Sequence, residues 1–351
     1  MQFLVIKNFK LLLFALLFAI HFKSNAQENF VKIISSEYIF ENAPFEACHA
    51  STLVEIDHKS IMSAWFGGKH EGSKDVSIWS STKKNGKWSA PLEIANGFQN
   101  DTLRYPCWNP VLFKAKNGTL YLHYKVGPNP RTWWAEYKTS NNNGKTWSLA
   151  QKLPDGFLGP IKNKPVQILN GSILYPSSTE SLDEKTWSIH IEKTDEFAKN
   201  WKKINIDCDT FGVIQPSILT YPNGKLQLLC RSRQNVIIES WSVDNGESWS
   251  KLKPTKLPNP NSGSDAVTLK DGRQILIYNP LESSKNWWEG RSVLKLAISK
   301  DGENWANIYT LEEHPKGEYS YPAIIESKDG VIHLSYTSLR KKIKYVSLRL
   351  K

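Results

Sequence analysis

The stretch 111–127, VLFKAKNGTLYLHYKVG, contains an apolar segment, an Asn-Gly turn and a second apolar segment. Asn-Gly tolerates the positive φ that a two-residue hairpin loop requires, so the pattern predicts a β-hairpin. Five of six such turns in the chain are Asn-Gly or Asp-Gly. The six copies of the hairpin pattern lie at 51–67, 111–127, 166–178, 217–233, 267–280 and 323–338. A supersecondary unit repeated at this spacing indicates a repeat architecture.

A second repeated element lies between the hairpins. Ser242–Trp249, SVDNGESW, is a complete Ser-x-Asp-x-Gly-x-Ser/Thr-Trp turn, the pattern known as an Asp box. Residues 140–147 and 299–305 are close variants, and 81–88 and 194–201 are looser ones. The aspartate can accept backbone N–H groups across its turn while the tryptophan packs between neighbouring sheets. We therefore interpret these turns as structural and assign none of their residues to catalysis.

The spacing of the hairpins predicts the fold. Hairpin starts lie 50 to 60 residues apart, which suits four short strands per unit. Six such units cannot bury their faces singly, but they can in a ring. We predict an all-β protein with a single domain over residues 27–351, a six-bladed β-propeller with Asp-box turns. Residues 343–350 and 30–40 are expected to share one blade. A large β-sandwich is the alternative, and six hairpins with intervening Asp boxes make it the poorer fit.

The N-terminal segment indicates export. Lys7 and Lys10 precede the apolar run 11–20, and small residues follow at 24–26, which is the pattern of a signal peptide over residues 1–26. Ten apolar residues are too few to span a bilayer as a helix. We expect an exported protein, periplasmic or secreted, with no membrane span.

Charge and cysteine content narrow the class of partner. The formal charge of +11 falls to +8 without Lys7, Lys10 and Lys23, and a basic excess favours anionic partners. Export and the absence of a Lys/Arg-rich run argue against nucleic acid, so we expect an anionic polysaccharide or oligosaccharide substrate. The four cysteines show no CxxC spacing, and disulfides and buried free thiols both remain open. We expect a monomer that needs no cofactor and no metal.

Alignment of the six repeats places one polar residue at the start of each innermost strand. Proline follows four of them, which fixes an extended start without loss of a hydrogen bond. Polar strand ends are common, but six diverse polar residues at one face predict a ligand site on the axis. The six residues are His49, Asn109, Lys164, Gln215, Asp265 and Tyr321.

The segments after the second strand of each hairpin should line the rim of the same face. They are rich in arginine, whose guanidinium can bond both oxygens of a carboxylate or sulfate, and in tryptophan, which can stack on sugar rings. An anionic glycan is the ligand that this set favours. The rim residues are Lys69, His70, Glu71, Asp75, Arg131, Trp133, Trp134, Glu180, Arg231, Arg233, Trp287, Trp288 and Arg291.

The Asp boxes and the order of these polar positions resemble the sialidase superfamily over essentially the whole chain after residue 26. The resemblance implies three arginines that hold a carboxylate, a tyrosine nucleophile activated by a glutamate, and an aspartate acid/base. Arg231 and Arg291 look like the second and third arginines, and Asp75, in GSKDVSIW, like the aspartate. Tyr319, in EYSYPAI, looks like the tyrosine, with Tyr321 a close competitor.

Two positions depart from the sialidase pattern. His49 stands about where the first arginine would be, and Gln215 replaces the glutamate. These departures favour β-elimination from a terminal uronate over hydrolysis, with His49 and Tyr319 as base and acid and with Asn109, Gln215, Arg231 and Arg291 on the carboxylate. Further substrate-binding candidates are Arg131, Lys164, Arg233, Asp265 and Tyr321. Hydrolysis with Asp75 as the acid, sialidase activity and a non-catalytic glycan-binding propeller remain the alternatives.

Overall fold

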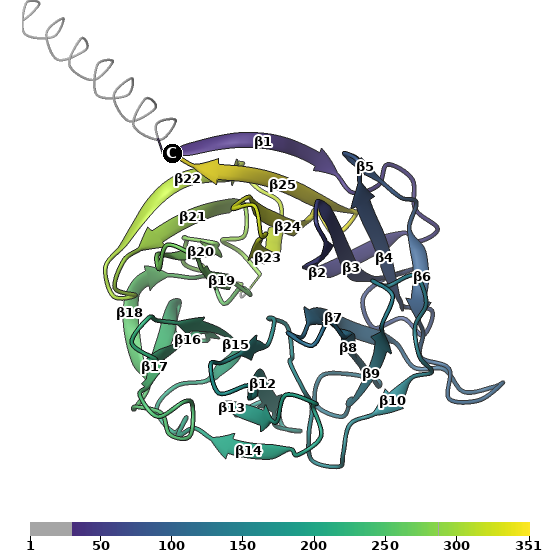
Figure 1. Ribbon diagram of the computed structural model, residues 1–351, viewed down its shortest axis with the longest axis horizontal. Coiled ribbons are helices and arrows are strands. Elements are labelled where there is room, and N and C mark those ends of the chain that lie inside the picture. Colours follow the sequence, from purple (N-terminus) through teal and green to yellow (C-terminus); the bar gives the residue numbers. More distant parts are fainter. Residues whose placement is uncertain (1–29, 287) are drawn as a thin grey trace, which may run out of the picture.

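Six antiparallel β-sheets surround a central axis in the computed structural model of the protein (Figure 1). The structure describes residues 30–286 and 288–351, and the expected signal peptide, residues 1–26, lies outside them. The described residues contain strands and turns but no helix, and therefore no helix long and apolar enough to cross a membrane. The prediction of an all-β, six-bladed propeller is confirmed.

Each sheet forms one blade, and the blades follow one another in chain order around the ring. Blade 1 consists of β2 (Ala47–Asp57), β3 (Ser60–Gly68), β4 (Ser77–Lys84), β5 (Lys87–Trp88) and β6 (Leu92–Ala95). Blade 2 consists of β7 (Cys107–Lys114), β8 (Leu120–Val126), β9 (Trp134–Ser140) and β10 (Gln151–Lys152). Blade 3 consists of β11 (Val166–Gln167), β12 (Ile173–Glu180), β13 (Trp187–Thr194) and β14 (Lys202–Asn205).

The remaining three blades complete the ring. Blade 4 consists of β15 (Val213–Thr220), β16 (Leu226–Ser232), β17 (Val236–Ser242) and β18 (Lys253–Pro258). Blade 5 consists of β19 (Asp265–Thr268), β20 (Gln274–Tyr278), β21 (Val293–Ser299) and β22 (Trp305–Glu313). Blade 6 consists of β23 (Tyr319–Glu326), β24 (Ile332–Ser338), β25 (Lys342–Leu350) and β1 (Val31–Tyr38).

All six predicted hairpins form the two innermost strands of a blade, with antiparallel pairing. The five glycines of the Asn-Gly and Asp-Gly turns have φ between 76° and 93°, in the left-handed region that glycine occupies without steric cost. The ring closes as predicted, because β1 pairs with β25.

Hydrophobic clusters between neighbouring blades hold the ring together. Six clusters of buried side chains are found, and each joins one pair of adjacent blades. Between blades 1 and 2, for example, Ile78 and Leu122 are fully buried. Since burial of one large aliphatic side chain contributes about 1.5–3 kcal/mol, the blades depend on their neighbours for stability.

The Asp boxes have the structural role predicted for them. A carboxylate oxygen of Asp244 accepts the backbone N–H of Ser248 at 3.0 Å, and the indole of Trp249 donates to the carbonyl of Gly246 at 3.2 Å. All four cysteines lie in the described part of the chain, and none of them forms a disulfide there.

Candidate active site

Four of the six innermost strands carry the same β-bulge near their starts. In β2, β7, β15 and β23 two consecutive residues face one residue of the partner strand. The first residue of each bulge has a positive φ although it is not glycine: Ala50 at 56°, Asn109 at 36°, Gln215 at 56° and Tyr321 at 51°. Left-handed non-glycine residues cost on the order of 1–3 kcal/mol and gather at functional sites, where a bulge re-aims a side chain.

The bulges correct the alignment made from sequence. The residue that corresponds to Asn109, Gln215 and Tyr321 is Ala50, and His49 corresponds to the preceding residue of each strand. Blade 1 therefore contributes a methyl group where three other blades contribute an amide or a phenol. β11 and β19 pair in continuous register, so Lys164 and Asp265 do not belong to the set either.

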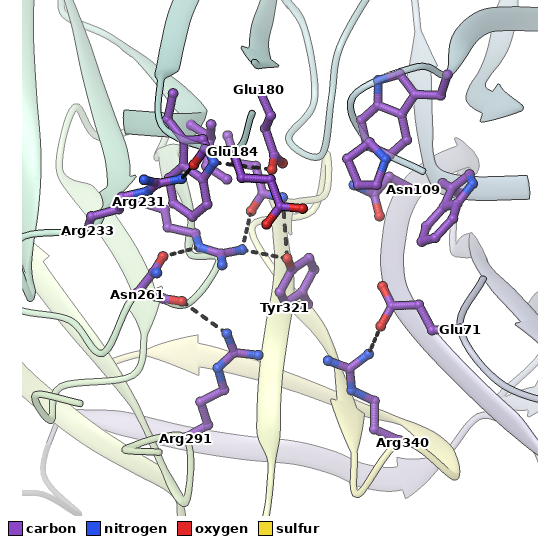
Figure 2. Close-up of a pocket in the computed structure, with 16 residues that line it drawn as sticks. Glu71, Asn109, Glu180, Glu184, Arg231, Arg233, Asn261, Arg291, Tyr321 and Arg340 are labelled. Atoms are coloured by element: carbon purple, nitrogen blue, oxygen red, sulfur yellow. Dashed lines mark hydrogen bonds and ion pairs between the residues drawn. The ribbon is translucent and has the colours of Figure 1, made fainter. Parts of the chain in front are cut away.

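A cavity of about 490 Å³ lies at this end of the axis (Figure 2). Three kinds of polar side chain line it together with indole rings. The guanidinium groups are those of Arg231, Arg233, Arg291 and Arg340, the carboxylates those of Glu71, Glu180 and Glu184, and the uncharged polar groups those of Asn109, Gln215, Asn261 and Tyr321. The indoles are those of Trp108, Trp133 and Trp187. Nine of the predicted residues are brought together here: Glu71, Asn109, Trp133, Glu180, Gln215, Arg231, Arg233, Arg291 and Tyr321.

The Tyr321 hydroxyl lies among hydrogen-bond donors. Nη1 of the buried Arg231 donates to it at 2.6 Å, and Nε2 of Gln215 donates at 3.3 Å (Figure 2). Both donors stabilise negative charge on the phenolic oxygen, because one is cationic and the other presents its positive amide end. The arrangement suits a tyrosine oxygen that acts as a nucleophile or a base.

Arg291 and Arg340 are joined by a carboxylate behind the cavity. Arg291 donates to Glu318 at 3.0 Å, and Arg340 holds both oxygens of Glu318 at 2.8 Å and 3.0 Å. Burial alone would raise the pKa of Glu318, but the hydrogen bonds from Arg340 and the charge of Arg291 lower it well below its ordinary value. Glu318 therefore stays ionised and fixes the two guanidinium planes.

Asn261 links Arg291 to Arg231, so the three guanidinium groups form one network. Its side-chain oxygen accepts from Nε of Arg231 at 2.7 Å, and its carbonyl accepts from Arg291 at 3.0 Å. At the other end Arg340 also pairs with Glu71, across the cavity wall (Figure 2). Within this network three cations face two carboxylates, and its excess of positive charge favours an anionic ligand.

Arg340 is a cavity residue that the sequence analysis missed. It follows β24, in a turn where Leu339 and Arg340 have φ of 53° and 58°. This is the segment after the second strand of the sixth hairpin. The rule that identified Arg231, Arg233 and Arg291 as rim residues would have found Arg340 if it had been applied to the last repeat. Asn261, Glu184, Trp108 and Trp187 lie in loops and strand starts that carried no sequence signal.

The hairpin loop 181–185 forms one wall of the cavity and is held from both sides. Arg131 pairs with Glu184, and Arg233 donates to the carbonyls of Glu184 and Lys185 at 2.5 Å and 3.1 Å. Arg131 thus supports the wall without lining the cavity. The guanidinium carbon of Arg233 lies 4.2 Å from the ring centre of Trp187.

Glu180 enters the cavity from this wall (Figure 2). The indole of Trp187 donates to its carboxylate at 3.1 Å. Burial raises the pKa of Glu180, although the nearby charge of Arg231 acts in the opposite direction. A carboxyl group with a raised pKa can hold a proton and deliver it, which is the requirement for a general acid.

Three residues predicted to be catalytic, Tyr319, Asp75 and His49, lie outside the cavity. Tyr319 is buried at the edge of the blade 5–blade 6 cluster, where its ring stacks on His314 with ring centres 4.5 Å apart. Asp75 is exposed, and its carboxylate accepts the backbone N–H of Lys69 at 2.8 Å within its own turn. Burial slightly opposes ionisation of Asp75, but the hydrogen bonds from Ser73 and Lys69 lower its pKa, which does not suit a general acid.

His49 is buried behind Tyr321 and does not line the main cavity. Its ring lies 4.1 Å from that of Tyr321, and Nδ1 is 2.8 Å from the Thr337 hydroxyl. Nε2 has no hydrogen-bond partner among the described residues. Burial and the charge of Arg340 lower the pKa of His49 well below its ordinary value, so the imidazole is neutral. His49 instead lines a small side cavity of about 290 Å³, next to Phe66 and Arg340.

Lys164 and Asp265 bind each other instead of lining the cavity. The Lys164 ammonium donates to both oxygens of the Asp265 carboxylate, at 2.8 Å and 3.0 Å. The predicted rim residue Trp287 lies outside the described residues. Residues 30–286 and 288–351 contain no cluster of three or more His, Cys, Asp or Glu side chains that could hold a metal ion.

The fold and the cavity together define a sialidase-like β-propeller, in which arginines and a tyrosine meet at one end of the axis. Residues 59–334 match the family of BNR repeat-like domains. The chain belongs to that family.

Known proteins with similar sequences or structures agree with this assignment. The anhydrosialidase of Macrobdella decora is 27% identical over 180 residues, which cover 47% of this chain and 23% of that protein. The chain therefore matches less than a quarter of the length of this curated relative.

Three solved structures share the fold at low sequence identity. A protein of unknown function from Dyadobacter fermentans has a TM-score of 0.73 at 17% identity, covering 92% of this chain and 99% of its own. The NanB sialidase of Streptococcus pneumoniae has a TM-score of 0.70 at 14% identity, covering 90% and 70%. The intramolecular trans-sialidase of Ruminococcus gnavus has a TM-score of 0.68 at 15% identity, covering 89% and 96%.

Proposed function

We propose that the protein is an exo-acting glycosidase that releases a terminal, carboxylate-bearing sugar of the sialic acid type from an anionic glycan. One observation carries the proposal: Arg231, Arg291 and Arg340 surround the hydroxyl of Tyr321 in one cavity. Three guanidinium groups hold a carboxylate, and the tyrosine oxygen then lies beside the carbon that bears it. The similarity to an anhydrosialidase and to sialidase structures supports the same class of reaction.

The proposed reaction has two steps, both at the anomeric carbon. The Tyr321 phenol loses its proton to water, and the phenolate is held by Arg231 and Gln215. Its oxygen bonds to the anomeric carbon as the glycosidic C–O bond breaks, while Glu180 gives its proton to the leaving oxygen. Water then breaks the tyrosyl–sugar bond, and the Glu180 carboxylate takes a proton from that water.

This assignment replaces the acid and the nucleophile expected from sequence. Glu180 stands in for Asp75 because it lines the cavity and holds a proton more readily. Tyr321 stands in for Tyr319 because only Tyr321 reaches the arginines. Because Gln215 stands in place of a glutamate and cannot act as a base, the tyrosine is activated by Arg231.

A second candidate is β-elimination from a terminal uronate. The neutral amides of Asn109 and Gln215 favour it, since together with an arginine they can neutralise a uronate carboxylate. Tyr321 would then have to act as the base, because His49 does not reach the cavity. Hydrolysis accounts for all three arginines and for Glu180, and we therefore rank it first.

Product analysis on sialylated and uronate-terminated oligosaccharides tests the two reactions together. Mass spectrometry should show gain of one water and release of the terminal acidic sugar. A new ultraviolet-absorbing C4–C5 double bond without gain of water would favour elimination instead. Binding of the oligosaccharides without turnover would show a glycan-binding propeller and refute both. Tyr321→Phe, which removes only the hydroxyl, is the control for either activity.

A further inference from the structure

Blade 3 begins differently from the bulged blades, and the difference reaches the active site. Its first strand, β11, is only two residues long, and the segment 161–165 before it is not a strand. Lys162 and Asn163 in this segment are buried, at 5% and 2% exposure. A buried lysine needs several acceptors to offset the loss of water.

Two of the three acceptors of Lys162 lie outside blade 3. Its ammonium donates to the carbonyl of Pro322 at 2.7 Å, to the carbonyl of Ser264 at 3.1 Å and to the side chain of Asn163 at 2.8 Å. Pro322 is the second residue of the bulge that begins with Tyr321. Lys162 is therefore bonded directly to the backbone that sets the direction of the Tyr321 side chain.

Asn163 makes the corresponding contact to blade 4. Its amide donates to the carbonyls of Gln215 and Pro216, at 3.0 Å and 3.2 Å, which are the two residues of the β15 bulge. One segment of blade 3 thus ties the bulge that carries Tyr321 to the bulge that carries Gln215. Both bulges start with a left-handed residue, which needs such restraint to persist.

Lys162 packs tightly beneath these residues. A Cβ placed on Gly263 would lie 2.8 Å from Cε of Lys162 and 3.2 Å from the side-chain oxygen of Gln215. The Lys162 ammonium also lies 5.8 Å from the ring centre of Tyr321. The lysine has little room to take another conformation.

We propose that Lys162 is a positioning residue, which holds the Tyr321 bulge so that the phenol stays on Arg231. The role rests on the proposed function of Tyr321 as the nucleophile. Lys162 does not line the cavity and acts only through the Pro322 carbonyl. Its loss should lower kcat and leave substrate binding by the arginines nearly unchanged.

The protonation of Lys162 should matter for the same reason. An ammonium has three N–H donors for its three acceptors, whereas a neutral amine has two. Burial lowers the pKa of Lys162 to about 7, with Asp265 acting against the shift and Lys164 and Arg231 adding to it. Those three groups and the Tyr321 ring face the ammonium. As pH rises through this value, the hold on Pro322 weakens and kcat should fall.

Lys162→Met tests the role because methionine keeps the length of the side chain without its donors. Lys125→Met is the matched control: Lys125 is also buried, burial lowers its pKa to about 7 as well, and it donates to the Pro160 carbonyl at 2.9 Å. The probe is a fluorogenic α-glycoside of N-acetylneuraminic acid. We expect kcat to fall roughly 10- to 100-fold in Lys162→Met with KM within about 3-fold, since small misplacement of a reacting group costs that much. The fall of kcat as pH rises through about 7 should also be absent from Lys162→Met.

Gly263→Ala gives a second, independent variant that keeps the lysine. The added methyl group should displace the end of the Lys162 side chain and lower kcat in the same direction. Three results would overturn the role of Lys162. They are an unchanged kcat in Lys162→Met, a fall of its kcat near pH 7 like that of the wild type, and an equal decrease of kcat in Lys125→Met.

Failure of the proposed function is distinguishable from failure of this inference. If the wild-type protein does not act on the probe, crystal structures of the two lysine variants decide. The contact of 2.6 Å between Arg231 and the Tyr321 hydroxyl should be lost in Lys162→Met and kept in Lys125→Met. An unmoved Tyr321 in Lys162→Met would refute the positioning role whatever the enzyme's substrate is.

Discussion

The innermost strands of blades 1 and 6, β2 and β23, have the same backbone geometry but contribute differently to the site. Both carry a bulge whose first residue is left-handed, and the two strands are neighbours where the ring closes. In β23 the bulge presents Tyr321 to the cavity, whereas in β2 the corresponding Ala50 is buried and does not line it. The repeat thus fixes where a side chain can enter the site, and the residue at that place decides whether it does any chemistry.

The guanidinium group that blade 1 does not provide comes from blade 6. Arg340, in the turn after β24, pairs with Glu71 of blade 1 and with Glu318, and so brings a third guanidinium to the cavity. The sialidase resemblance predicts that the first arginine comes from the first inner strand. Here the same charge arrives from a turn of the last blade, because a long arginine side chain can span the blade junction.

Removal of the Tyr321 hydroxyl should have the largest effect of any change in this comparison. Tyr321→Phe keeps the ring and its packing against His49 but removes the proposed nucleophile, so kcat should fall at least about 10³-fold. Tyr319→Phe, two residues earlier and outside the cavity, should stay within about 3-fold of the wild type. Initial rates on a fluorogenic sialoside provide the measurement. A larger loss in Tyr319→Phe than in Tyr321→Phe would reverse the assignment of the tyrosine.

Loss of the third guanidinium should come next in size. Arg340→Met leaves Glu318 with Arg291 alone and Glu71 without its cation. Truncation of one member of a buried, hydrogen-bonded charge pair costs about 2–5 kcal/mol, so binding of a free sialic acid should weaken by at least about 30-fold in calorimetry. Arg349→Met is the control, because Arg349 is a half-exposed arginine of the same blade that lies 3.7 Å from Asp329. Equal binding by both variants would show that Arg340 takes no part in the clamp.

The fold could be predicted from sequence because its signals are local. Each Asn-Gly or Asp-Gly turn lies between apolar segments within one hairpin, and each Asp box bonds to its own backbone. Blade closure by β1 and β25 followed from the need to pair two remaining edge strands.

The site was harder to predict because it depends on a shift of one residue. Proline after Asn109, Gln215 and Tyr321 marks the bulge in three strands, but serine follows Ala50. Because His49 beside it is polar, the alignment from sequence placed His49 at the position that Ala50 occupies. Proline also follows Lys164, where no bulge forms. Strand alternation predicts that Tyr319 and Tyr321 point to the same face, whereas in the structure Tyr319 packs in the blade 5–blade 6 cluster and Tyr321 contacts Arg231.

The pH dependence of stability should distinguish a structural His49 from a catalytic one. Its pKa is lowered on folding, so the unfolded chain binds the proton more tightly, and stability present above about pH 6.5 is lost as pH falls below it. The slope from one such group is at most about 1.4 kcal/mol per pH unit. In urea titrations between neutral and acidic pH, His49→Asn should lose less stability than the wild type.

His58→Asn provides the control, since His58 is exposed and does not line the cavity. Activity gives the second readout for His49. His49→Asn should retain turnover within about 10-fold, because a buried neutral imidazole only packs behind Tyr321. A decrease in turnover of about 10³-fold or more would indicate that His49 is a general base after all, and would favour the elimination reaction.

The smallest effect should come from Ala50, and its difference from a matched alanine is the informative part. An alanine with φ of 56° costs roughly 1–2 kcal/mol of steric strain, of which glycine is free, while glycine adds about 0.5–1 kcal/mol of unfolded-state entropy. Relief of strain less the entropy cost is worth roughly 0 to 1.5 kcal/mol, and loss of the buried Ala50 methyl group costs about 0.8 kcal/mol, so Ala50→Gly should leave the free energy of unfolding within about 1 kcal/mol of the wild type. Ala64→Gly, in the facing strand β3, is buried and not left-handed, so it should lower that free energy by about 1 kcal/mol or more. Denaturant titrations compare the two. If both substitutions destabilise alike, β2 does not share the strained bulge of β23, and the equivalence of Ala50 with Tyr321 fails.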